Sequence, residues 1–212
     1  MAGTTSSRRA RGAQAIADTL IDGRRASRDR NLNAVVDALL DLFHEGNMRP
    51  GADEIAARSG VSRRSVFRYF DALDELDRVA IARQQARVAH LIEIAHAGEG
   101  TIEERIERLV QQRMRLFGAI APVARVSRLR APFHPVVARE LEEGRRFLRR
   151  QAERQFEPEL SGLPREWRAS TAAALDVLTS FESYELLVGA RRMSARQAGE
   201  ALRHALRALL NS

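Results

Sequence analysis

The sequence lacks two residue types altogether. Cysteine is absent, and lysine is absent too, so that all 35 basic residues among the 212 are arginines. Without cysteine the chain has no disulfide framework, no thiolate nucleophile and no cysteine-based zinc or iron–sulfur site. An arginine-only preference can follow from the base composition of a genome and carries little functional weight, although arginine does suit bidentate contacts with phosphate and guanine.

Long hydrophobic runs are also missing. No uninterrupted apolar stretch approaches the roughly 20 residues that a bilayer-spanning helix needs. Residues 1–30 lack the apolar segment and the cleavage site of a secretory signal. Aromatic residues make up only 5% of the chain, but 44% of the residues are hydrophobic and 30% are charged, a balance typical of globular proteins. We therefore expect a cytoplasmic protein with no membrane partner.

The formal net charge of +7 is unevenly distributed. Residues 1–30 hold seven arginines and three aspartates, a net charge of +4, whereas residues 31–70 hold five residues of each sign and residues 71–212 have a net charge of +3. A basic N-terminal segment on a near-neutral body is common in DNA-binding proteins, but it is also common as a solubilising tail. Because residues 1–29 mix Gly, Ser, Thr and Arg with one short apolar patch, we predict a flexible basic arm there.

The rest of the chain has the periodicity of α-helices. Apolar residues recur at intervals of three and four, as in Leu32, Val36, Leu39 and Phe43, and nothing alternates with period two over a useful length. This pattern predicts an all-α fold of about nine helices. We expect residues 30–75 to form an N-terminal three-helix domain and residues 76–212 a larger helical domain, with a loop over residues 157–164, which contain two prolines and a glycine.

Two short helices are predicted inside the N-terminal domain. The first covers about residues 52–58, and Gly60 ends it because glycine readily adopts the left-handed conformation that closes a helix. Ser62 is placed to cap the second, over about residues 63–69. When the apolar residues of both helices pack inward, a set of potential donors to phosphates and base edges stays outside, namely Ser62, Arg63, Arg64, Ser65 and Arg68. Two such helices, packed against a preceding amphipathic helix, can place the second in the major groove of DNA.

The stretch from Asp53 to Phe70 resembles the helix-turn-helix of the tetracycline-repressor (TetR) family of bacterial transcriptional regulators, and the resemblance covers residues 31–80. It implies a homodimer that binds double-stranded DNA and responds to a small molecule held in the C-terminal domain. Phe67 stands where the family commonly has a tyrosine near the phosphate backbone, and Arg68 where histidine is frequent. The candidate DNA-binding residues are Ser62, Arg63, Arg64, Ser65, Phe67, Arg68 and Tyr69.

Two positions depart from the family pattern. Pro50-Gly51 replaces the Thr or Ser that usually caps the first of the two helices and touches phosphate, and the usual lysine is missing after the pair Tyr69-Phe70. Both changes remove expected backbone contacts. Affinity is therefore expected to depend more on the arginines of the second helix and on the N-terminal arm.

The C-terminal domain is expected to hold the dimer interface and the effector. One headpiece makes few base contacts, so specific recognition normally needs two copies on a two-fold-related site. The interface candidates lie on the apolar faces of the last two predicted helices: Leu175, Leu202, Ala205, Leu206 and Leu209. Large apolar residues that could surround a largely apolar effector are Met114, Phe117, Phe147, Trp167, Leu178, Phe181 and Tyr184. For all of these residues, ordinary core packing is the alternative.

Two other functions were weighed against a ligand-responsive regulator, which we expect to be a repressor rather than an activator. For an enzyme, the five histidines are scattered without metal-ligand spacing, and the chain has neither a Gly-rich phosphate loop nor a Gly-x-Ser-x-Gly motif. No metal, cofactor or catalytic residue is therefore expected. A ligand-independent architectural DNA-binding protein would have a basic body, whereas residues 71–212 are close to neutral.

Overall fold

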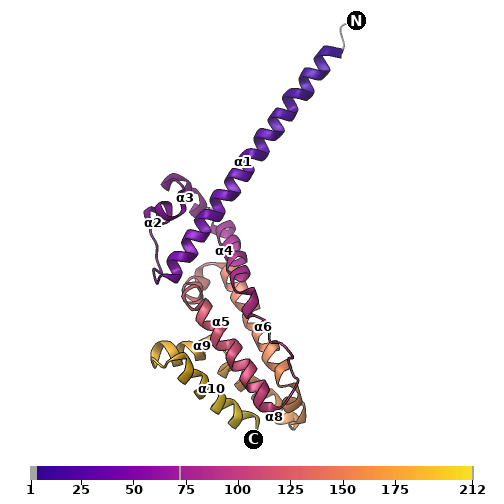
Figure 1. The fold of residues 1–212 in the computed structure, drawn as a ribbon, viewed down its shortest axis with the longest axis vertical. Coiled ribbons are helices and arrows are strands. Elements are labelled where there is room, and N and C mark those ends of the chain that lie inside the picture. The colour runs from indigo at the N-terminus through magenta and orange to yellow at the C-terminus, as the bar shows by residue number, and fades with distance from the viewer. Residues whose placement is uncertain (1–3, 72, 212) are drawn as a thin grey trace. The chain divides into compact units, whose positions relative to one another are not determined.

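The computed structural model of the chain describes residues 4–71 and 73–211. Within these ranges it has ten α-helices and no strand, which confirms the predicted all-α fold (Figure 1). None of the helices in this part of the chain is both long and apolar enough to span a lipid bilayer. The chain divides into two compact units, Met1–Arg83 and Gln84–Ser212. The division therefore falls inside a helix, after residue 83, rather than at the predicted position after residue 75.

The first unit contains α1 (Thr4–His44), α2 (Ala52–Ser59), α3 (Arg63–Asp71) and the beginning of α4 (Leu73–Val88). Helix α2 packs against both α1 and α3. All three helices bury apolar side chains completely, and these form the core: Val35 and Val36 of α1, Ile55 of α2 and Val66 of α3. Burial of this kind, rather than the intrinsic helix propensity, stabilises helices as short as α2 and α3.

Helix α1 starts earlier than the sequence predicts. The expected flexible arm over residues 1–29 and the expected helix from about residue 30 are replaced by one continuous helix from Thr4. The chain has no proline before Pro50, so a helix can run through this segment without losing a backbone donor or meeting a proline ring. A contact between this segment and DNA stays a prediction.

The second unit begins with the end of α4 and the 3-10 turn η1 (Ala89–Leu91), and its long helices are α5 (Ile102–Arg130) and α6 (Pro135–Gln155), joined by η2 (Ala131–Phe133). The remaining elements are α7 (Glu157–Gly162), α8 (Arg165–Leu178), α9 (Phe181–Tyr184), the π-helical turn η3 (Glu185–Ala190) and α10 (Ala195–Leu210). Helix α5 packs against α6 and α10, and α8 packs against the same two helices.

Two hydrophobic clusters fill this unit. The first, which we call the bundle core, joins α5, α6, α8 and α10, and its buried members include Leu109, Phe156, Leu175, Leu202 and Leu206. The second, which we call the aromatic cluster, contains Val88, Leu116, Phe117, Phe181 and Tyr184. Three of its rings are in contact: the centroid of Phe117 lies 5.6 Å from that of Phe181 and 5.7 Å from that of Tyr184.

The caps and prolines of the second unit agree only in part with what the sequence indicates. Thr101 and Glu104 have the three-residue spacing of a capping box, and the structure confirms one at the start of α5, because the Thr101 N–H donates to the Glu104 carboxylate at 2.7 Å and the Glu104 N–H donates to Thr101 Oγ1 at 3.3 Å. Proline usually interrupts a helix, but Pro122 lies inside α5, which continues to Arg130. Residues predicted to form a loop contain α7, whose Pro158 stands in the first turn, where proline is tolerated.

Ion pairs tie the helices of this unit together. Arg207 bonds Glu103 at 2.7 Å and Arg203 Nη2 bonds Glu107 at 2.9 Å, so both pairs link α10 to α5. Glu182 accepts hydrogen bonds from Arg128 at 3.0 Å and from Arg145 at 2.8 Å. Partial burial raises the pKa of Glu182, but the bonds from the two arginines outweigh it and lower the pKa to about 2. This carboxylate is therefore charged at neutral pH and joins three helices.

Candidate nucleic-acid interface

A tight turn joins α2 to α3. Gly60 has a φ of 67°, the left-handed region that glycine enters freely, and its N–H donates to the Ala56 carbonyl at 3.0 Å, which ends α2. The Ser65 N–H donates to Ser62 Oγ at 3.3 Å, so Ser62 caps α3. Both predicted roles are confirmed. Between them, the buried side chain of Val61 anchors the turn to the core.

The start of α2 is capped by a residue that the sequence reasoning missed. Glu54 Oε2 accepts a hydrogen bond from the Gly51 N–H at 2.7 Å, and its Oε1 accepts another from Asn47 Nδ2 at 3.1 Å. The carboxylate thus replaces part of the capping that a Thr or Ser before the helix would give, and its negative charge suits the N-terminal end of a helix. The spacing from Gly51 to Glu54 is the signal that could have found it, since Glu at the third helical position completes a capping box.

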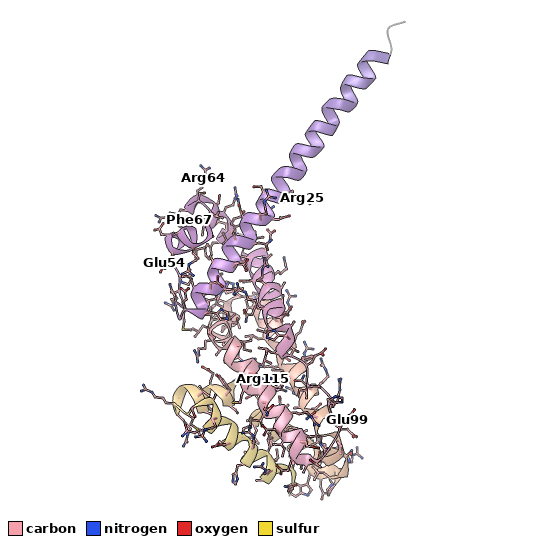
Figure 2. All side chains as sticks on the ribbon, in the orientation of Figure 1. Arg25, Glu54, Arg64, Phe67, Glu99 and Arg115 are labelled. Atoms are coloured by element: carbon pink, nitrogen blue, oxygen red, sulfur yellow. The ribbon has the colours of Figure 1, made fainter. Side chains whose placement is uncertain are left out.

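Helix α3 separates its residues into an inward and an outward face. Val66 and Tyr69 are buried, whereas four of the predicted contact residues are exposed and Ser65 is half-buried. The exposed four are Arg63, Arg64, Phe67 and Arg68, and Ser62 just before the helix is exposed as well. In Figure 2, the Arg64 and Phe67 side chains extend from this short helix away from α1.

The three arginines of this face differ in their surroundings. Arg63 lies 3.2 Å from the Asp53 carboxylate, and its guanidinium stands 5.5 Å from the centroid of the Phe67 ring. The Arg68 guanidinium lies at the same distance from the Tyr69 ring. Within the described residues Arg64 has neither an ion-pair partner nor a side-chain hydrogen bond. Phe67 and Asp53 therefore restrict Arg63, while Arg64 is available to a ligand without loss of an internal contact.

Tyr69 belongs to the inward face, which corrects its place among the predicted DNA contacts. Only 2% of this residue is exposed, and its hydroxyl donates to the Arg28 carbonyl of α1 at 3.1 Å. The helical period explains the difference, because Tyr69 follows Val66 by three residues and so lies on the same side of α3. Its contribution is to hold α3 against α1, and through the Arg68 contact to position the neighbouring guanidinium.

The outward face can bind an extended polyanion. Three guanidinium groups offer donors in a fixed planar geometry that matches phosphate oxygens and the guanine edge, and Ser62 adds a hydroxyl. Phe67, of which 49% is exposed, adds an apolar surface within this polar set. No acidic residue lies among residues 62–70. Asp53 in the first turn of α2 pairs with Arg63, and the exposed Asp71 ends α3.

The residues predicted to surround an effector do not lie together. Phe117, Phe181 and Tyr184 meet in the aromatic cluster, Met114 packs against both clusters, and Leu178 packs against the bundle core. Phe147 and Trp167 belong to neither cluster, and 42% and 60% of these residues are exposed, so an effector contact at either stays a prediction. Helical periodicity shows on which face of a helix a large side chain lies. It does not show whether another helix covers that face.

The predicted dimer contacts also need correction. Leu175, Leu202 and Leu206 are at most 4% exposed and form the bundle core of a single chain, so they are not free to meet a partner. Ala205 and Leu209 are half-buried, and Leu209 packs against the same core. Three strongly exposed apolar residues of this unit were not among the interface candidates. They are Trp167 and Val177 on α8, and Leu186 on η3, each at least 60% exposed.

Comparison with known proteins adds no assignment. No protein-family model matches the chain, and no curated protein matches it. The functional argument therefore depends on the residues and on the geometry described above.

Proposed function

We propose that this chain is a DNA-binding transcriptional regulator of the TetR type, in which α2 and α3 form the helix-turn-helix and α3 enters the major groove. One observation carries the proposal. The α3 face turned away from the core presents Arg63, Arg64 and Arg68 with no acid before Asp71 at the end of the helix, next to a glycine turn and a serine cap of the kind found in helix-turn-helix motifs. An ordinary surface helix of this length would alternate its charges and gain stability from ion pairs between adjacent turns.

The exposed side chains of α3 are assigned different contacts with DNA. Arg64, which has no competing contact, is the best candidate to read a base edge, since bidentate arginine contacts to guanine are the commonest specific ones. Arg63 and Arg68 lie against aromatic rings and suit phosphate contacts, which position a protein on the duplex without reading its sequence. Phe67 cannot donate a hydrogen bond to a phosphate and instead offers van der Waals contact to sugar or base.

We also propose that the regulator acts as a homodimer on a (pseudo)palindromic operator. The support is the exposed apolar surface of three large side chains in the second unit, Trp167, Val177 and Leu186, each at least 60% exposed, because exposed apolar side chains can contribute to a protein interface. A two-fold interface would pair this surface with itself. The residues of the bundle core would then support the interface from behind rather than form it.

Regulation by a small molecule completes the proposal, and a cytoplasmic location follows from it. An effector releases DNA only if it binds the DNA-incompetent conformation more tightly, by several kcal/mol for an almost complete switch. Repression is the expected outcome of operator binding. A ligand-independent architectural role is the second candidate, and it would leave DNA affinity unchanged by any small molecule.

A binding titration tests the proposal. The full-length chain is titrated against fluorescent duplexes taken from the region upstream of its own gene, with unrelated duplexes of equal length, and anisotropy is recorded at several salt concentrations. We expect preferential binding of the upstream DNA and an affinity that falls steeply with salt.

The variant pair for this titration is Arg63→Ala/Arg64→Ala, and its control is Arg150→Ala/Arg154→Ala, which removes the same charge from exposed positions on α6. We expect the first pair to lose specific binding and the control to keep it. Full affinity in the first pair would show that the DNA-binding surface lies elsewhere. Equal loss in both pairs would reduce the interaction to unspecific attraction between charges.

A further inference from the structure

Arg113 is an unusual residue of the second unit. It lies in the middle of α5, only 1% of it is exposed, and its guanidinium bonds neutral acceptors only. Nη1 donates to the side-chain oxygens of Gln112 and of Gln151, the latter at 2.6 Å, and Nη2 donates to the Leu148 carbonyl at 2.9 Å. Its Nε is buried and has no hydrogen-bond partner in the described part of the chain.

No carboxylate neutralises this buried cation. The acid that acts on it from a distance is Asp176, but Asp176 is already bonded to Arg149 at 2.8 Å. Burial lowers the pKa of Arg113 to about 10, with Asp176 opposing the change, so the group still carries its charge at neutral pH. The other deeply buried arginine of this unit, Arg105, shows the ordinary solution, since it forms an ion pair with Glu159.

A structural role alone does not account for Arg113. Its bonds to Leu148 and Gln151 do link α5 to α6, but a neutral amide side chain could make such links without bringing a charge into the protein. Removing a guanidinium from water is expensive unless an anion and a full set of hydrogen bonds compensate it. The chain supplies only some of the hydrogen bonds and no adjacent anion. The Arg113 guanidinium therefore lacks a negatively charged partner.

The surroundings of Arg113 indicate what the missing partner is attached to. Phe117 follows Arg113 by one turn on the same face of α5 and belongs to the aromatic cluster with Phe181 and Tyr184. Helix α4 carries a second polar group of this kind. Both amide atoms of Gln84 are buried and have no hydrogen-bond partner among the described residues, and Gln84 precedes Val88, another member of the cluster, by one turn. Apolar rings are thus accompanied by two incompletely bonded polar side chains.

We propose that Arg113 binds the carboxylate of an amphiphilic small molecule whose apolar part contacts the aromatic cluster. The Nε and an Nη of one guanidinium can donate to the two oxygens of a carboxylate in a planar bidentate pair. A contact of this kind supplies the missing negative charge and satisfies Nε, and Gln84 can bond a polar group elsewhere on the molecule. The inference rests on the proposed function only in that it makes this molecule the effector, and it adds a carboxylate to the largely apolar effector expected from the sequence.

Matched acid and amide probes test this inference. The full-length protein, without DNA, is examined by thermal shift and calorimetry with octanoate and 4-phenylbutyrate, and with the corresponding neutral amides octanamide and 4-phenylbutanamide. Because a ligand of the native state raises its melting temperature, we expect the acids to raise it and to bind about tenfold or more tightly than the amides. Equal affinity of acid and amide, or no binding of either acid, would overturn the proposal.

Variants identify the residue responsible. Arg113→Met should abolish the preference for acid over amide, whereas the control Arg150→Met, which removes an exposed charge from α6, should keep it. If Arg113→Met does not fold, Arg113→Gln is the substitute, because an amide can keep the links to α6. Retention of the acid preference in a folded Arg113 variant would refute the assignment. Since none of these measurements uses DNA, acid binding by a chain that fails to bind DNA would refute the proposed function and leave this inference standing.

Discussion

The ion pair between Asp53 and Arg63 predicts a variant that binds DNA more tightly than the natural sequence. The Asp53 carboxylate lies 3.2 Å from Arg63 Nη1, and both side chains are more than 60% exposed. An exposed pair of this kind is worth about 0.2–1 kcal/mol, and Arg63 loses that contact when it turns to a phosphate. Asp53 also repels the phosphates themselves, by about 0.5 kcal/mol at a separation of about 8 Å in water. The variant Asp53→Asn removes both terms.

We therefore expect Asp53→Asn to raise DNA affinity about two- to fivefold at low salt, and less at high salt, where the charges are screened. Anisotropy titrations at two salt concentrations measure this change. Glu143→Gln is the control, because it removes an exposed acid of the second unit and changes the net charge equally. An equal gain in the control, or a loss of affinity in Asp53→Asn with an unchanged melting temperature, would refute the assignment of Arg63 to the DNA surface. A small loss of stability, about 0.3–1 kcal/mol, is expected because the acid lies at the N-terminal end of α2.

Three further predictions concern stability and assembly. Tyr69→Phe removes the hydrogen bond to α1 and should lower the free energy of unfolding by about 1 kcal/mol in denaturant titration, without changing which DNA is preferred; altered preference at unchanged stability would contradict its inward role. Because the pKa of Glu182 is lowered to about 2, its stabilisation is complete above its ordinary pKa and is lost as the pH falls toward 2. The half-exposed carboxylate should therefore make the natural chain about 1 kcal/mol more stable than Glu182→Gln at pH 6, and this difference should shrink below pH 4 in thermal melts. Val177→Arg should give a folded monomer in light scattering and weaken DNA binding with it; a dimer that persists would place the interface elsewhere.

Local sequence signals predicted the site better than they predicted the rest of the molecule. Gly60, Ser62 and the capping box at Thr101 act through hydrogen bonds between residues at most four positions apart, so their structure follows from the neighbouring residues alone. The outward position of Arg63 and Arg64 also follows from periodicity, once the apolar residues of α3 are assigned to the core.

Contacts between distant segments could not be predicted in the same way. The periodicity of α10 shows one apolar face, but the same pattern fits a face covered by α5 of its own chain and a face covered by a second chain. Leu202 and Leu206 were therefore assigned to an interface although they lie in the bundle core. Arg113 illustrates the same limit, since arginine is usually exposed and its local sequence does not show that α6 covers it.

The choice of residue at the turn between α2 and α3 is limited by the backbone conformation and not by the space around it. A side chain built on Gly60 would meet no atom within 4 Å, so the cost of replacing this residue comes only from its φ of 67°. An L-alanine must adopt that conformation against its own backbone, whereas a D-alanine prefers it. A mirror-image residue introduced at position 60 by chemical ligation would thus fit where its natural counterpart is strained, and the angle between the two short helices could be fixed more rigidly than any genetically encoded residue allows.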